Sequence, residues 1–416
     1  MKVIHIVAEM DPTKGGVCQA IRTIAAGLAD LGVTNEVASL DAPDAPFLAS
    51  DSVTVHALGP GRGPWFYGAD YLPWLQQNLA RFDVIVVHGL WSYHSYAAAK
   101  ALKWLRAQRG TGVIPKLFVM PHGMLDPYFQ RAAGRKLKAM RNWIYWKLIE
   151  GQLINQAAGV LFTCEDELRL AQQPFRPYQP KKAVVVGLGV EEPPPYTDAM
   201  REAFLAKCPT LRNQPYLLFL SRIHEKKGVD TLLAAYASLA GAPKLAAGAT
   251  VAITPAAVLP SGAATASPLL IAGPGLETAY GQQQQQVVID SAVLQQQVFF
   301  PGMLTGLAKW GAFYCCEAFV LPSHQENFGI AVVEALACEK AVLISNQVNI
   351  WREIEAAGGG IVGDDTLAGT QQVLAHWQHL PAEQRRHMAA GARACFTENF
   401  TVEAAAARLL AALAAA

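Results

Sequence analysis

Two glutamates, Glu326 and Glu334, stand on either side of a glycine, with seven residues between them. Residues 318–321 have the length of a buried strand, and residues 322–329 form a polar loop ending in Gly329. The apolar residues that follow recur with a helical period. Free N–H groups and the positive end of the helix dipole would therefore point at an anion in this loop. A loop acid and a first-turn helix acid are also ordinary at a helix start, so spacing alone leaves both readings open.

A basic loop follows another expected strand, at residues 216–220. Arg222 and Lys227 lie five residues apart, between this apolar run and Gly228, and a helical pattern follows. That spacing lets a guanidinium and an ammonium converge on one diphosphate. Surface cations are usually only solvated charges, but the position between a buried strand and a glycine favours a binding role.

The first half of the chain offers a histidine and a glycine pair at comparable places. His122 lies between Pro121 and Gly123 at the end of the expected strand 117–120. Ligands of open α/β sheets bind at that edge, although most single histidines are structural. Gly15 and Gly16 follow a strand expected at residues 3–8 and open a helix, but the Gly-x-Gly-x-x-Gly dinucleotide fingerprint is missing. The pair either lets a ligand approach the backbone or forms a simple tight turn.

Length and composition bound the class of protein. A chain of 416 residues predicts two domains, and 52% hydrophobic residues with a net charge of +1 favour a globular protein without nucleic acid as partner. Seven cysteines without a Cys-x-x-Cys pair suit a reducing cytoplasm better than a disulfide framework or a zinc site. The N-terminus enters a strand directly and does not resemble a signal peptide. No uncharged apolar run reaches the roughly 18 residues of a membrane span.

The proline run 193–195 marks the clearest linker. It predicts one domain over 1–191 and a second over 192–399, with a helix at about 400–416 packing back on the body. Residues 241–267 look like an inserted loop, in which 249–254 could add an edge strand. The glutamine run 282–286 suggests no chemistry.

One segment suggests a membrane surface. Residues 131–150 carry six basic residues before their first acid, interleaved with two tryptophans and a tyrosine. A helix of this composition could lie on an anionic membrane. The alternative, which the composition favours slightly, is a solvated face whose aromatic rings pack onto the domain core.

Taken in order, these motifs resemble the retaining GT-B glycosyltransferases of the "glycosyl transferase group 1" type, with its paired-glutamate motif. The resemblance is dense from about 216 to 345 and looser before that, and it rests on Ser221-Arg222, Lys227-Gly228, Ile271 to Gly275, Phe300 to Gly302, and Pro322 to Ala335. It implies an α/β GT-B fold of two Rossmann-like domains with parallel sheets facing across a cleft. In this family the first domain serves the acceptor, and the second binds the nucleotide sugar donor.

The resemblance also implies roles for single residues. Arg222 and Lys227 would hold the diphosphate and neutralise the leaving group. Gly329 and Ile330 would offer N–H groups to the phosphate, and Gly16 would approach it from the first domain.

The two glutamates and the histidine would handle the sugar. Glu334 resembles the glutamate that binds the ribose, and Glu326 the one that contacts hydroxyls of the donor sugar. His122 resembles the histidine near the transferred sugar. The expected catalytic residues are thus His122, Glu326, Arg222 and Lys227. The donor-binding residues are expected to be Gly16, Arg222, Lys227, Gly273, Met303, Glu326, Asn327, Phe328, Gly329, Ile330 and Glu334.

No Asp-x-Asp occurs in a matching context, so no metal and no cofactor are expected beyond the nucleoside diphosphate sugar itself. The expected activity is retaining transfer of a sugar to a glycan or lipid-linked acceptor in polysaccharide biosynthesis. The expected location is the cytoplasm, with a peripheral contact to the inner membrane surface through 131–150 as an open option. Two alternatives remain: transfer to a small soluble acceptor, as in sucrose-phosphate-type synthases, and a non-catalytic nucleotide-sugar-binding subunit. One departure is Glu339-Lys340, where the family usually has a glycine and a basic residue.

Overall fold

The computed structural model describes residues 1–110, 112–131, 133–212, 214–241 and 266–415. The chain divides into two compact units, one formed by Met1–Glu191 with Asn399–Ala416 and one by Glu192–Glu398. Most of the segment 241–267, including the edge strand suggested at 249–254, lies outside the described residues.

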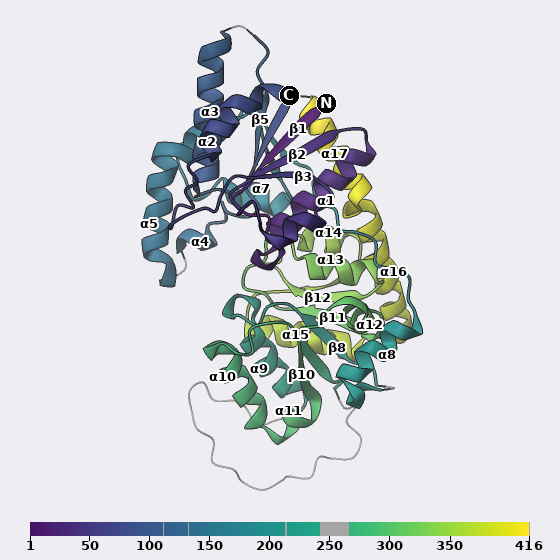
Figure 1. The fold of residues 1–416 in the computed structure, drawn as a ribbon. Helices are drawn as coiled ribbons and strands as arrows, with labels where there is room; N and C mark the ends of the chain where they lie inside the picture. The colour runs from purple at the N-terminus through teal and green to yellow at the C-terminus, as the bar shows by residue number, and fades with distance from the viewer. Residues whose placement is uncertain (111, 132, 213, 242–265, 416) are drawn as a thin grey trace. The chain divides into compact units, whose positions relative to one another are not determined.

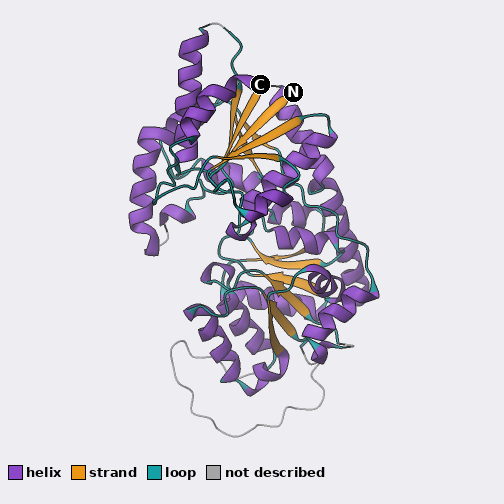
Figure 2. Cartoon of the chain, viewed as in Figure 1, coloured by secondary structure: helices purple, strands orange, loops and turns teal. Residues whose placement is uncertain are grey.

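Unit 1 is built on a seven-stranded parallel sheet with the strand order β3-β2-β1-β4-β5-β6-β7. Its strands are β1 Lys2–Ile6, β2 Thr34–Ser39, β3 Thr54–Ala57, β4 Val84–His88, β5 Lys116–Met120, β6 Gly159–Phe162 and β7 Ala183–Val185. The centre of this sheet is fully buried because its strands are nearly continuous apolar runs, as parallel strands covered on both faces require. Helices flank the strands, as Figure 2 shows.

The helices of unit 1 cover the two faces of the sheet. They are α1 Gly16–Asp30, α2 Tyr71–Asn78, α3 Tyr93–Arg109, α4 Tyr128–Arg131, α5 Lys136–Tyr145, α6 Gly151–Gln156, α7 Glu165–Ala171 and α17 Val402–Ala414. Short 3₁₀ turns occur at η1 Pro12–Lys14, η2 Pro46–Ser50, η3 Leu79–Arg81 and η4 Ala133–Arg135, and a π turn, η5, at Trp146–Glu150. The largest core cluster of the unit joins strand residues such as Ile4 and Val87 to side chains of α2, α3 and α6.

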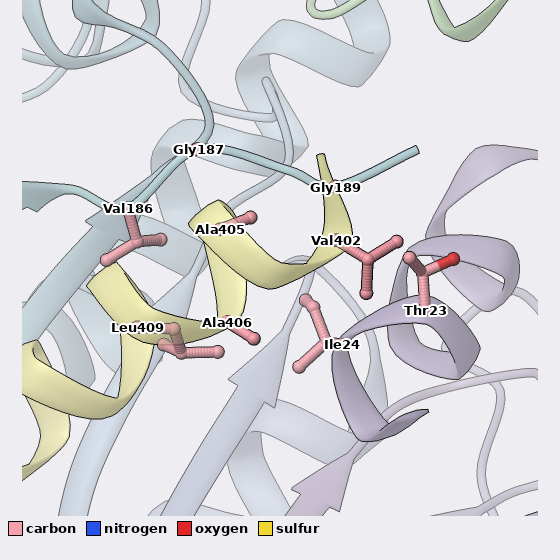
Figure 3. Close-up of a pocket in the computed structure, with 9 residues that line it drawn as sticks. All are labelled: Thr23, Ile24, Val186, Gly187, Gly189, Val402, Ala405, Ala406 and Leu409. Atoms are coloured by element: carbon pink, nitrogen blue, oxygen red, sulfur yellow. The ribbon is translucent and has the colours of Figure 1, made fainter. Parts of the chain in front are cut away.

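Helix α17 lies against α1, far from it in sequence (Figure 1). A Cβ added at Gly27 of α1 would lie 2.8 Å from Cβ of Ala406, so the two backbones approach as closely as a glycine allows. Figure 3 shows Ile24 of α1 facing Val402 and Ala406 of α17 around a small apolar pocket. Val186, Gly187 and Gly189 lie beside them. Arg408 of α17 donates to the carbonyl oxygen of Val186 at 3.1 Å and fixes the helix to the end of the sheet.

Unit 2 contains a six-stranded parallel sheet with the order β10-β9-β8-β11-β12-β13. Its strands are β8 Leu217–Leu220, β9 Leu269–Ala272, β10 Val298–Gly302, β11 Ala318–Leu321, β12 Ala341–Ser345 and β13 Gly360–Gly363. Its helices are α8 Asp198–Lys207, α9 Val229–Leu239, α10 Ala279–Ile289, α11 Ala292–Gln297, α12 Gly306–Cys315, α13 Ile330–Ala337, α14 Trp351–Ala356, α15 Leu367–His379 and α16 Ala382–Asn399, with 3₁₀ turns η6 Pro209–Leu211 and η7 Glu225–Lys227. The strand order reverses direction at β8 and β11, the kind of switch point where ligands bind in open α/β sheets.

The basic segment 131–150 differs from a single helix. It is broken into α4, η4, α5 and η5, and its aromatic residues do not share one environment. Trp146 is buried and stacks on Phe175 at 4.8 Å between ring centroids, whereas Trp143 is exposed. The π turn explains why the two tryptophans differ, because it shifts the helical register at the point where Trp146 enters the core.

Candidate functional site

The site in unit 2 forms where β8 and β11 end side by side at the centre of the sheet (Figure 1). Lys227, the last residue of the 3₁₀ turn after β8, forms an ion pair with the carboxylate of Glu326, which lies in the loop after β11. Lys227 is only 8% exposed. A buried cation next to a carboxylate is thus placed at the carboxyl edge of the sheet.

Backbone contacts hold these two loops together. The carbonyl oxygen of Lys226 accepts hydrogen bonds from the backbone N–H of His324 at 2.8 Å and from the hydroxyl of Ser323 at 2.9 Å. A Cβ added at Gly228 would collide with the carbonyl oxygen of Pro322. The glycine that follows Lys227 in the sequence is therefore required for the loops to cross at this distance.

The backbone of Glu326 is anchored from the other side. Its N–H donates to the carbonyl oxygen of Gln347 at 2.9 Å, and its carbonyl oxygen accepts from the N–H of Asn349 at 3.0 Å. Both partners belong to the loop after β12. With its main chain fixed at both ends, the Glu326 side chain can change partner without a loop movement.

The first turn of α13 is the expected anion site. Gly329 precedes the helix with a left-handed φ of 82°, and α13 begins at Ile330, which is partly exposed. The first N–H groups of a helix have no acceptor in the preceding turn. Next to Gly329, Phe328 is buried and packs the loop onto the unit, while Asn327 is half-buried.

Glu334 lies in the same helix but is paired elsewhere. Its Oε1 is 2.5 Å from Nζ of Lys309 on α12. Burial raises the pKa of Glu334, and the charge and hydrogen bond of Lys309 partly offset this shift. Lys309 was not among the residues expected from the sequence, because no local pattern links positions 25 residues apart on two different helices.

Arg222, Gly273 and Met303 surround the same edge. The Arg222 side chain is exposed and makes no hydrogen bond or ion pair with another residue in the part of the chain that the structure describes. A Cβ at Gly273 would collide with the carbonyl oxygen of Ser221, so the loop after β9 lies directly against the loop after β8. The N–H of Gly273 donates to Gly302 at 2.9 Å, and Met303, which follows Gly302, is 65% exposed.

His122 and Gly16 belong to unit 1. His122 follows β5 with a left-handed φ of 52°, and its Nε2 is 2.9 Å from Nδ1 of His88 at the end of β4. Burial lowers the pKa of His122 to about 4. Gly16 is the exposed first residue of α1, after β1. His122 thus belongs to an imidazole cluster that includes His88.

A buried carboxyl group holds the loop that follows β4. Oε1 of Glu150 accepts hydrogen bonds from the backbone N–H of Trp91 at 2.8 Å and from the hydroxyl of Ser95 at 2.7 Å. Burial raises the pKa of Glu150 to about 7, more than the two donors lower it. No role for Glu150 is predicted from the sequence, where it is only the first acid after a basic run.

Two negative observations apply to the described residues. They contain no group of three or more His, Cys, Asp or Glu side chains arranged to hold a metal ion. Within the same ranges, no helix combines the length and the apolar character needed to cross a bilayer.

Two Rossmann-like units with parallel sheets of seven and six strands define the GT-B class of fold. The family described as "Glycosyl transferase 4-like domain" matches residues 15–189, and the family "Glycosyl transferases group 1" matches residues 201–394. The chain belongs to the group 1 glycosyltransferases.

Two solved structures carry the same fold, and one further protein is similar in sequence. HepE of Anabaena, in complex with UDP and glucose, superposes with a TM-score of 0.73 at 17% identity, with 100% of each chain covered. Sucrose-phosphate synthase of Thermosynechococcus elongatus gives a TM-score of 0.68 at 18% identity, covering 99% of this chain and 98% of that one. The D-inositol 3-phosphate glycosyltransferase of Geodermatophilus obscurus is 27% identical over 58% of this chain, and the match spans 51% of that relative's length.

Proposed function

We propose that the protein is a retaining glycosyltransferase that moves a sugar from a nucleoside diphosphate sugar to a hydroxyl group of a glycan or lipid-linked acceptor. The observation that carries this proposal is the Lys227–Glu326 ion pair at the carboxyl edge of unit 2. An incoming diphosphate would take Lys227 as its partner and release Glu326 to bind sugar hydroxyls. One ligand with both an anionic and a hydroxylated end satisfies both side chains.

The other residues of unit 2 complete the donor site. Arg222 joins Lys227 on the diphosphate, where an exposed guanidinium offers a bidentate contact. The N–H groups of Gly329 and Ile330 bind a phosphate oxygen at the start of α13. Glu334, kept close to Lys309, accepts the ribose hydroxyls.

The remaining residues expected from the sequence are given the following roles. Met303, Gly273, Asn327 and Phe328 line the nucleotide and the sugar, and in unit 1 Gly16 contacts phosphate and His122 the transferred sugar. Lys227 and Arg222 stabilise the negative charge that develops on the leaving diphosphate, so the reaction proceeds without a metal ion or other cofactor. In this mechanism the departing phosphate helps to deprotonate the acceptor on the same face of the sugar, and the configuration is retained.

Nucleotide binding tests the proposal most directly. Thermal shift is measured with UDP, GDP, ADP and their sugars, starting with UDP and UDP-glucose, because HepE was solved with UDP and glucose. The melting temperature of the wild type should rise with the nucleotide and nucleotide sugar of one base. The rise should correspond to about 2.7 kcal/mol when the ligand concentration is a hundred times its Kd. Lys227→Met should abolish the rise. The matched control, Lys207→Met at an exposed position on α8, should leave it unchanged.

Two results would contradict the proposal. One is the absence of a shift with every nucleotide and nucleotide sugar, and the other is an equal shift in Lys227→Met and wild type. Binding without any donor hydrolysis or transfer would instead favour the non-catalytic subunit. Product analysis by NMR then reports the anomeric configuration, and an inverted product would refute retention.

A small soluble acceptor is the second candidate. It is favoured by the names of two similar proteins, a sucrose-phosphate synthase and a D-inositol 3-phosphate glycosyltransferase. Incubation of the enzyme with its donor and either small phosphorylated acceptors or lipid-linked glycans separates the two possibilities.

We further propose that α5 and η5 contact an anionic membrane at the inner, cytoplasmic surface. Leu137, Met140, Ile144 and Leu148 recur at three- and four-residue spacing and therefore share one face of the helix. All four are exposed, Leu137 at 79%. Exposed basic residues flank this stripe, namely Arg131, Lys136, Lys138 and Lys147. Apolar side chains between cations are the composition of helices that lie in the membrane interface.

Vesicle co-sedimentation tests this contact. The wild type should sediment with phosphatidylglycerol vesicles and not with phosphatidylcholine vesicles, and the double variant Lys136→Ala/Lys138→Ala should lose about 2 kcal/mol of binding, near thirtyfold. The control variant Lys103→Ala/Arg106→Ala removes two exposed cations of α3 in the same unit and should bind like the wild type. An equal loss of vesicle binding in both double variants would mean that the protein binds through its overall charge and not through α5 and η5.

A further inference from the structure

Three histidines form a hydrogen-bonded row across neighbouring strands of unit 1. His5 lies on β1, His88 ends β4 and His122 follows β5, and these strands are adjacent in the sheet. Nδ1 of His5 is 2.9 Å from Nε2 of His88, and Nδ1 of His88 is 2.9 Å from Nε2 of His122. His5 and His88 are fully buried, whereas His122 is partly exposed. The row runs from the interior of the sheet to its carboxyl edge.

The inner end of the row has a fixed polarity. The side-chain amide of Asn35 on β2 donates to the carbonyl oxygens of Ala25 at 3.1 Å and Val33 at 3.0 Å. Both amide hydrogens are thereby used, and its Oδ1 faces Nε2 of His5 at 3.1 Å. The reversed amide would place Oδ1 against two carbonyl oxygens, which repel it. Nε2 of His5 must therefore carry a hydrogen and donate to Asn35.

This polarity passes along the row. Burial lowers the pKa of His5 and of His122 to about 4 and that of His88 well below its usual value, so all three rings are neutral near pH 7. A neutral imidazole has one N–H and one acceptor nitrogen. Nδ1 of His5 thus accepts from Nε2–H of His88, and Nδ1 of His88 accepts from Nε2–H of His122. The outer ring is left with Nδ1 as an acceptor.

The backbone around His122 keeps its ring in place. The next residue, Gly123, donates its N–H to Oε1 of Glu167 at 2.5 Å, and Oε2 of Glu167 accepts from the hydroxyl of Thr163 at 2.7 Å. Among the residues that the structure describes, Nδ1 of His122 has no hydrogen-bond partner. This nitrogen is therefore available to a ligand.

We propose that Asn35, His5 and His88 are positioning residues that fix His122 in the tautomer whose Nδ1 accepts a hydrogen bond from a sugar hydroxyl. This rests on the glycosyl transfer proposed above. A neutral acceptor nitrogen selects a hydroxyl group and disfavours a phosphate or carboxylate, whose oxygens carry no hydrogen. The row orients His122 and does not conduct protons away from it, because the amide oxygen of Asn35 at the inner end neither supplies nor takes up a proton near neutral pH.

Long-range ¹H–¹⁵N NMR of the full chain labelled with ¹⁵N-histidine reads the tautomer directly, and His122→Gln identifies the signal. His122 should show a protonated Nε2 and an unprotonated Nδ1 between pH 6 and 8. His5→Phe removes the acceptor for His88, so His122 should become a mixture of tautomers. His5→Gln should restore the single tautomer, because its amide can donate to Asn35 and accept from His88.

A matched control lies beside the row. His94 is buried and donates from Nε2 to the carbonyl oxygen of His88 at 3.0 Å, so it touches His88 without joining the row of rings. His94→Gln should leave the tautomer of His122 unchanged. In transfer assays, kcat should fall at least tenfold in His5→Phe and stay within threefold of wild type in His5→Gln.

The outcomes separate this inference from the proposed function. A protonated Nδ1 on His122 of the wild type, or an unchanged tautomer in a folded His5→Phe, overturns the inference whatever the activity. The wild-type spectrum alone decides if His5→Phe does not fold. A confirmed tautomer in a protein that binds no nucleotide sugar would refute the proposed function and leave only the orienting row. Active enzyme with equal kcat in His5→Phe and wild type would remove its role in catalysis.

Discussion

Replacing Glu150 by glutamine should change how the stability of unit 1 depends on pH. The carboxyl group is fully buried, and both of its donors bind Oε1, while Oε2 has no partner among the described residues. Glutamine keeps the oxygen that accepts from Trp91 and Ser95 and places an uncharged amide at the other position. The variant therefore removes the ionisation and leaves the hydrogen bonds.

The magnitude follows from the pKa. Burial raises it from 4.5 to about 7, so the folded state holds the proton more tightly than the unfolded state. This contribution to stability is fully present below pH 4.5 and is lost as the pH rises through 7. At about 1.4 kcal/mol for each pKa unit, the loss amounts to roughly 3 kcal/mol. Unit 1 should thus melt about 6–12 °C lower at pH 8 than it would with a neutral side chain.

Scanning calorimetry of both proteins from pH 4.5 to pH 8 measures this effect. We expect the difference in melting temperature, Glu150→Gln minus wild type, to grow by about 6–12 °C between pH 4.5 and pH 8. All other titrating groups are shared by the two proteins and cancel. Glu191→Gln, an exposed position of the same unit, is the control and should give no such trend. A difference independent of pH would refute the reasoning and place the ionised carboxylate in a better solvated environment.

Four further predictions concern the rest of the molecule. Lys227→Met should lower the transfer rate about a thousandfold, because neutralising a charge near 4 Å contributes about 4 kcal/mol at an effective dielectric constant of 20; a steady-state rate within tenfold of wild type would contradict the role. Glu339→Gly should stabilise unit 2 by about 1 kcal/mol in urea unfolding. Glu339 adopts a φ of 58°, a conformation that is less favourable for a residue with a side chain than for glycine. A destabilised variant would disprove this. Gly27→Leu should destabilise unit 1 by about 1–3 kcal/mol through overpacking against α17. The control Ala26→Leu, on the exposed side of α1, should leave the stability unchanged. Equal melting temperatures of the two variants would show that α17 can move away. EDTA should leave the transfer rate unchanged, and an activity restored only by a divalent cation would show that a metal takes part.

Several elements could be predicted from the sequence because their signals are local. The apolar runs 269–272 and 318–321 coincide with β9 and β11, since a strand buried on both faces needs a continuous apolar run. The sequence does not predict strand β2, because Thr-Asn-Glu-Val-Ala-Ser contains only two apolar residues. Its position beside β1 decides its structure, and that pairing is not written in the segment itself.

The candidate site divides in the same way. The places of Lys227 and His122 could be predicted because each follows a strand and adjoins a glycine, and their binding roles stay predictions. The side chains that contact such residues could not be predicted. The contact of Glu334 with Lys309, and that of His5 with Asn35, depend on the register between elements distant in sequence.

The packing of α17 on α1 has a consequence for biosynthesis. Unit 1 includes residues 399–414, so its apolar face on α1 stays uncovered while Glu192–Glu398 are being translated. At about 5–20 residues per second, that interval lasts roughly 10–40 s. Unit 2 is contiguous, so it depends on no residue that is translated after Glu398. Throughout this interval the nascent chain therefore carries an unfinished first unit, and chaperones that bind apolar helix faces would meet it at that stage.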